Sequence, residues 1–148
     1  MERGFGGLRL VATVAVAVAA LCGAVLSTPT PGEEELRATT ALTSVVCFLA
    51  AFTASALARL RPSPGTRWLL TNRRYLGLSF AVSHLAHGLA IAALQRRTNF
   101  LASYDLTTLI GGGLGFALIA LLAATSNDAA VRWLGAPAWK RLHGIGVH

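Results

Sequence analysis

The 148-residue chain is 54% hydrophobic and has 19 charged residues, 13 of them Lys or Arg and 6 of them Asp or Glu. About a quarter of the residues in an ordinary soluble domain are charged, so the composition predicts a membrane protein. Two cysteines are too few for a disulfide scaffold, and the abundance of Ala, Leu and Val excludes intrinsic disorder. The formal charge of +7 comes from basic residues between apolar segments, so we expect contact with membrane lipid and no nucleic-acid partner.

Four stretches without Asp, Glu, Lys or Arg are long enough for helices that cross a bilayer. A membrane barrel would instead show short segments of alternating hydrophobicity. The sequence therefore predicts an all-α fold, a multi-span bundle forming a single transmembrane domain over residues 1–148. The expected spans lie near residues 10–30, 38–58, 75–95 and 106–126.

The first span has a second interpretation as a signal peptide, because Arg3 and Arg9 precede it and small residues follow it. Its apolar length exceeds that of an ordinary signal and no clear cleavage motif appears, so we predict a retained helix. Pro29, Pro31 and Gly32 are expected to end this helix and turn the chain.

Basic residues predict the orientation of the chain. Residues 59–74 include five arginines and no acidic residue, which favours a cytoplasmic location. Arg3 and Arg9 come to the same side after two crossings, so the N-terminus is expected in the cytoplasm.

Residues 128–140 are a polar connector with two tryptophans, a pattern typical of a segment at the headgroup boundary. From about Leu142 the chain becomes apolar again, which predicts the start of a fifth helix. A span needs about 20 residues and Leu142 to His148 are only seven, so we expect the sequence to be a fragment of a longer chain, with an interfacial stub as the alternative.

All four histidines fall in the second half, His84 and His87 in the third span and His143 and His148 in the predicted fifth helix. An ionisable side chain inside a membrane is a functional candidate, and neutral imidazole is a standard axial ligand of haem iron. All four are therefore candidate cofactor-binding residues and iron ligands. Counted by helical rise, His84 matches His148 in depth, whereas His143 lies nearer the membrane surface.

Two other interpretations of the histidines remain open. They could serve only as interhelical hydrogen-bond donors in a cofactor-free membrane scaffold or assembly protein. A transition metal held by the His84 and His87 pair has less support, because no span contains a carboxylate. The glycines between Gly111 and Gly115 indicate close helix packing, and no catalytic residue is predicted.

Two patches resemble the ferric reductase-like transmembrane domain family, which includes the haem-binding membrane subunit of the bacterial periplasmic methionine-sulfoxide reductase system. The first patch is RRYLGL at residues 73–78, with His87 thirteen residues after its second arginine. The second runs from Thr125-Ser126 through WLG at residues 133–135 to WKRLH at residues 139–143.

The resemblance implies a haem b cofactor whose ligands fall on His87 and His143, not on the His84 and His148 pair that depth favours. It implies an electron-transfer subunit of an oxidoreductase in a bacterial-type inner membrane, relaying electrons to a partner or acceptor. Quinol, or the flavin of a redox partner protein, would be the donor. The family's next histidine would lie past His148, beyond this sequence.

Overall fold

The computed structural model describes residues 2–26, 33–98, 102 and 104–145, and these ranges contain six helices and no strand. The all-α fold class is therefore confirmed. His148 and the predicted turn at Pro29, Pro31 and Gly32 lie outside the described residues. The helices are α1 (Glu2–Leu26), α2 (Glu33–Leu60), α3 (Pro64–Thr98), α4 (Leu106–Ala124), α5 (Asp128–Leu134) and α6 (Ala136–Ile145).

Four of these helices, α1 to α4, are long and apolar enough to cross a membrane, as the sequence predicts. Helix α3 begins well before the predicted span at residue 75, because its start is capped. The Ser63 hydroxyl accepts a hydrogen bond from the Thr66 amide, and the Thr66 hydroxyl accepts one from the Ser63 amide. Pro64 fits the first helical position because its fixed φ suits a helix and its missing N–H is not needed there. Much of the predicted cytoplasmic loop is thus helical.

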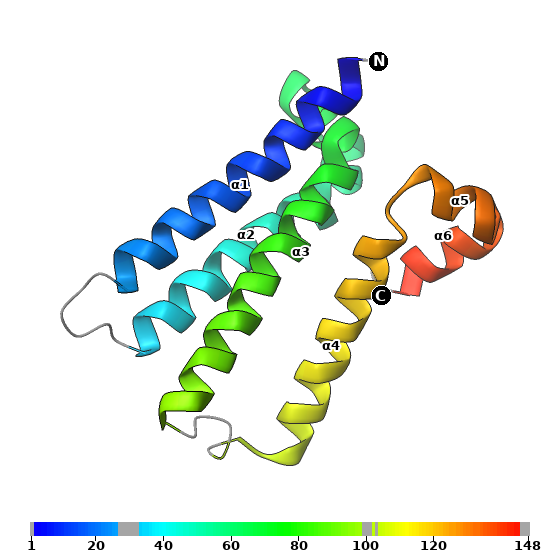
Figure 1. The fold of residues 1–148 in the computed structure, drawn as a ribbon. Helices are drawn as coiled ribbons and strands as arrows, with labels where there is room; N and C mark the ends of the chain where they lie inside the picture. Colours follow the sequence, from blue (N-terminus) through cyan, green and yellow to red (C-terminus); the bar gives the residue numbers. More distant parts are fainter. Residues whose placement is uncertain (1, 27–32, 99–101, 103, 146–148) are drawn as a thin grey trace. The chain divides into compact units, whose positions relative to one another are not determined.

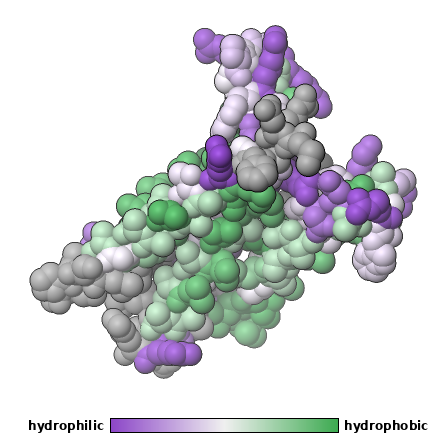
Figure 2. All heavy atoms as spheres, turned by 45° about the horizontal axis from the view of Figure 1, so that its top comes forward, coloured by the Kyte–Doolittle hydropathy of each residue, from purple (hydrophilic) through white to green (hydrophobic). Residues whose placement is uncertain are grey.

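The chain divides into two compact units, residues 1–103 and 104–148, and each is described by itself. In the first unit α1, α2 and α3 pack side by side, and α3 makes its most extensive contact with α2 (Figure 1). Helices α1 and α3 approach closely where Gly7 lies against the ring of Tyr75. Large apolar side chains remain exposed along these helices, as suits a lipid-facing surface (Figure 2).

Small side chains form the interior of the first unit. Ala54, Ser79 and Ser83 have no exposed surface, and Thr40 and Ser44 are almost fully buried. Small residues let helix backbones come close together, which is the usual source of helix association in lipid. The fully buried part of the contact between α2 and α3 is therefore built from small side chains, several of which are hydroxyls.

The second unit consists of α4, α5 and α6. Asp105 caps α4, and Asn127 caps α5 by accepting a hydrogen bond from the Ala130 amide at 2.8 Å. Gly135 joins α5 to α6 with a φ of 76°, a left-handed conformation that glycine adopts without strain. Helix α6 starts at Ala136, ahead of the fifth helix predicted from about Leu142, so the polar connector is itself mostly helical.

The cap of α4 predicts a pH effect. The Thr108 backbone amide donates to the Asp105 carboxylate at 2.7 Å, and this bond and the Thr108 side chain hold the pKa of Asp105 below its ordinary value. Because the folded-state pKa is the lower one, the capping stabilisation is complete above the unfolded-state pKa. It is lost as pH falls through the folded-state pKa.

Amide hydrogen exchange at Thr108 is expected to accelerate, relative to its intrinsic rate, as the solution is acidified below about pH 4. Asp105→Asn retains a capping oxygen but removes the titrating group, so that variant is expected to show no such dependence. An unchanged protection of Thr108 through this range in the native chain would contradict the prediction.

Candidate functional site

A row of hydroxyl groups and one histidine joins α2 to α3. Thr40 Oγ1 lies 2.9 Å from Nδ1 of His87. One turn away, Ser83 Oγ donates to Thr43 Oγ1 at 2.9 Å and lies 3.2 Å from Ser44 Oγ. These five residues, Thr40, Thr43, Ser44, Ser83 and His87, are called the hydroxyl seam below.

The hydroxyl seam follows from the helical repeat. Thr40 and Ser44 lie four residues apart on α2, and Ser83 and His87 lie four apart on α3, so each pair shares one helix face. Ser44 Oγ also donates to the Thr40 carbonyl at 3.0 Å, and Thr43 Oγ1 donates to the same carbonyl at 3.0 Å. The seam therefore gives these buried hydroxyls hydrogen-bond partners on the two helices.

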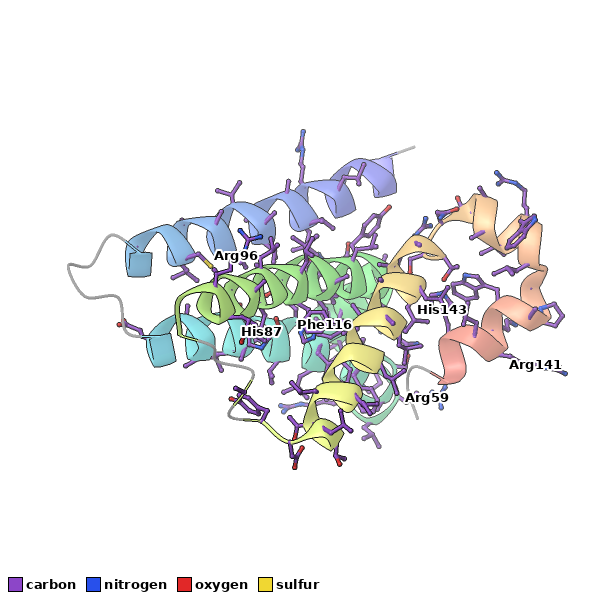
Figure 3. All side chains as sticks on the ribbon, turned by 60° about the horizontal axis from the view of Figure 1, so that its bottom comes forward. Arg59, His87, Arg96, Phe116, Arg141 and His143 are labelled. Carbon is purple, nitrogen blue, oxygen red and sulfur yellow. The ribbon has the colours of Figure 1, made fainter. Side chains whose placement is uncertain are left out.

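His84 and His87 lie next to each other on α3, with ring centroids 5.7 Å apart. Phe80 stands one turn before His84 at 5.3 Å, and Phe48 of α2 contacts Phe80 at 5.4 Å. Both histidines are half-buried, and His87 is labelled in Figure 3. His84 thus extends a row of aromatic rings, whereas His87 belongs to the hydroxyl seam.

His143 has its own set of contacts inside the second unit. Its Nε2 lies 3.0 Å from Thr125 Oγ1, and its ring stacks on Trp139 with centroids 4.1 Å apart. The indole Nε1 of Trp139 donates to the Thr125 carbonyl at 2.8 Å. Thr125, Trp139 and His143, which belong to the second patch of the sequence, therefore meet at the junction of α4 and α6.

The structure brings some predicted site residues together and leaves others separate. His84 and His87 are neighbours, His143 lies in the other unit, and the depth match of His84 with His148 stays a prediction. Within the described residues, no three His, Cys, Asp or Glu side chains are grouped as a metal site would require. A metal ion held by protein side chains alone thus has no support there, whereas haem needs only axial ligands.

Sequence reasoning missed the contact of His87 with Thr40, and it missed the bonds that join Ser83 to Thr43 and Ser44 further along the seam. The available signal was the spacing of small polar residues four apart inside two apolar spans. That signal identifies a face of each helix but does not say which two helices meet.

Comparisons with protein-family models, with curated proteins and with solved structures each gave no match. The functional interpretation therefore depends on the residues of this chain and their contacts. The resemblance to the ferric reductase-like domain stays a prediction.

Proposed function

We propose that the chain is a haem-b-binding membrane subunit that relays electrons across the bilayer, with His87 as an axial ligand of the iron. The observation that carries the proposal is the contact between Thr40 Oγ1 and His87 Nδ1. A histidine that binds iron usually has its second ring nitrogen held by a hydrogen bond, which fixes the tautomer and the ring orientation. Thr40 would provide this contact from the neighbouring helix.

The chemistry of His87 fits this role. When Nδ1–H donates to Thr40, the lone pair on the ring lies at Nε2, the nitrogen that haem iron would take. His84 lies beside it, and the apolar helices around both histidines would exclude water from the iron. Haem itself would supply the one-electron redox change, and the chain would supply ligation, burial and orientation.

His143 fits a ligand role only after a change of partner. Its Nε2 already contacts Thr125 Oγ1, so binding of iron at this nitrogen would replace that hydrogen bond. Stacking on Trp139 would continue to hold the ring. His143 is therefore one of the candidates for the other axial ligand, together with His84 and His148.

The remaining steps of the proposed electron path involve other molecules. Electrons would come from a membrane quinol or from the flavin of a redox partner protein, and an acceptor on the opposite side would receive them. We propose a bacterial-type inner membrane with the N-terminus in the cytoplasm, since the arginine-rich segment at residues 59–74 favours that side.

A second function, a cofactor-free membrane scaffold or assembly protein, is favoured by the hydroxyl seam. Its side chains already satisfy one another across α2 and α3, with His87 as one member. In that case the histidines would be structural hydrogen-bonding groups. Replacing His87 with Gln, which keeps hydrogen-bonding atoms, would then leave folding intact.

The deciding measurement is a reduced-minus-oxidised absorbance spectrum, with pyridine haemochrome quantification, of protein purified after haem-supplemented growth. We expect a b-type spectrum that is lost in His87→Gln. Thr40→Val is expected to weaken haem retention by about 10- to 100-fold, the usual effect of removing the group that orients a ligand. Thr53→Val is the matched control, because Thr53 lies on the same helix and bonds only within it, to the Leu49 carbonyl.

Two outcomes would count against the haem proposal. One is the absence of bound haem from folded protein. The other is an equal effect of Thr40→Val and Thr53→Val on the spectrum. The first outcome would favour the scaffold function, and the second would remove Thr40 from any role in orienting His87.

A further inference from the structure

Arg73 of α3 does not extend outward from the bundle but reaches across to α2. Its Nε donates to the Ala51 carbonyl at 3.2 Å, and its Nη1 donates to Ser55 Oγ at 3.2 Å. The side chain is half-buried between the two helices. Ala51 and Ser55 lie eight and four residues before Arg59, so the guanidinium sits about 6–12 Å deeper in the bundle than that arginine.

The charge on Arg73 is not balanced by a carboxylate. The sequence has no Asp or Glu from residue 36 to residue 104, and no described acidic side chain contacts Arg73. Both of its partners on α2 are neutral oxygen atoms. A partly buried cation is usually paired with an anion, and a guanidinium has five N–H donors arranged to bind a carboxylate or phosphate. The two bonds to α2 involve Nε and Nη1 of a group that has five donors, so donors remain for an anion.

A second cation lies along the same face of α2. Positions 51, 55 and 59 are four residues apart, which places Arg59 one turn beyond Ser55 on the face that Arg73 contacts. Arg59 is exposed in the last turn of α2, where Figure 3 labels it. Arg73 thus contacts the Ser55 hydroxyl, and Arg59 lies one turn further along the same face of α2.

The surroundings indicate which kind of anion fits. Leu60, Trp68 and Leu70 are exposed near this end of the hairpin, at 83%, 50% and 45%. Tryptophan and arginine at the end of a membrane span are typical of the headgroup layer, where apolar and charged groups meet. An anion that enters here meets apolar side chains as well as arginines, which favours a phosphate carried on acyl chains.

We propose that Arg73, Arg59 and the Ser55 hydroxyl form a binding site for the phosphate of an anionic phospholipid headgroup. Arg73 holds the phosphate at a fixed depth because α2 orients its guanidinium, and Arg59 adds the second positive charge. The site is separate from the histidines. Arg73 lies fourteen residues before His87 on α3, about 21 Å along the helix axis, so lipid binding does not depend on haem.

The test is thermal unfolding of the purified full chain in neutral detergent, titrated with phosphatidylglycerol, phosphatidylcholine or inorganic phosphate. We expect phosphatidylglycerol to raise the unfolding temperature, and the other two to have little effect at the same concentrations. Arg73→Gln is expected to lower the apparent affinity for phosphatidylglycerol about tenfold, because charged hydrogen bonds to the phosphate are lost. Arg132→Gln is the matched control, since it removes the same charge from an exposed position on α5.

A second variant keeps the test decisive if Arg73→Gln does not fold. Ser55→Ala retains both arginines and removes only the hydroxyl, and we expect it to weaken binding of phosphatidylglycerol while leaving unfolding in pure detergent nearly unchanged. Equal stabilisation by phosphatidylcholine and phosphatidylglycerol would overturn the proposal, as would equal losses in the Arg73 and Arg132 variants. Stabilisation by inorganic phosphate alone would show an anion site with no role for lipid and would also overturn it.

Discussion

Replacing Gly7 with alanine is expected to destabilise the first unit, whereas the same change at the adjacent Gly6 is expected to be neutral or stabilising. A Cβ atom at Gly7 would overlap the ring of Tyr75, including the ring carbon nearest the backbone. The ring cannot move aside by a simple rotation of its far end, so α1 must shift away from α3. Overpacking of this kind costs about 1–3 kcal/mol.

Gly6 is a matched control because it is one residue away in the same helix and a Cβ atom there would meet nothing within 4 Å. Alanine stabilises a helix relative to glycine by up to about 1 kcal/mol. The two substitutions should therefore change the free energy of unfolding in opposite directions. Thermal unfolding in detergent, followed by circular dichroism, measures both. Equal stabilities of the Gly6→Ala and Gly7→Ala proteins would show that α1 does not pack against Tyr75 in this way.

Two buried serines on α3 are expected to respond in opposite directions to alanine. Ser83 and Ser79 both have no exposed surface. Ser83 Oγ bonds to Thr43 and contacts Ser44, whereas Ser79 Oγ has no hydrogen-bond partner among the described residues. Interhelical hydrogen bonds in membranes contribute about 0.6 kcal/mol on average and up to about 1.7 kcal/mol. Ser83→Ala is therefore expected to lower the free energy of unfolding by an amount in this range.

Ser79→Ala removes a buried hydroxyl whose lack of a partner costs about 1–3 kcal/mol, so the free energy of unfolding is expected to rise. Each substitution deletes one oxygen from a fully buried site, and the cavity terms therefore largely cancel in the comparison. The free energies can be measured by denaturant titration in mixed micelles. A loss of stability in Ser79→Ala as large as that in Ser83→Ala would mean that the Ser79 hydroxyl has a partner in the membrane.

The helical fold could be predicted from the sequence because a bilayer imposes length and composition on each span. Runs without charged residues identified the four long helices. Apolar and polar residues do not alternate within these runs, which excluded a barrel. The start of α3 was harder to find, because the Ser63 and Thr66 cap lies among arginines and prolines that are typical of a loop. Local capping therefore extends a helix beyond its apolar run.

The candidate site could be predicted only in part. His84, His87 and His143 stand out because imidazole is costly in a membrane, but the sequence does not say that Thr40 contacts His87 or that Thr125 contacts His143. Those contacts depend on which helix faces meet and on how far one helix is shifted along its axis relative to the other. Arg73 likewise looked like one more basic residue of a cytoplasmic segment, and only the packing of α3 on α2 shows that it turns inward.

The hydroxyl seam also bears on how the chain enters a membrane during synthesis. Helices α2 and α3 are joined by only three residues, Arg61 to Ser63, so they can pair as a hairpin as soon as both have been synthesised. Because Ser44, Ser83 and Thr43 bond to one another across that pair, their polar atoms can be covered before the helices meet lipid. The two helices would then leave the insertion machinery together as a closed hairpin, with α1 joining it later through the Gly7 contact.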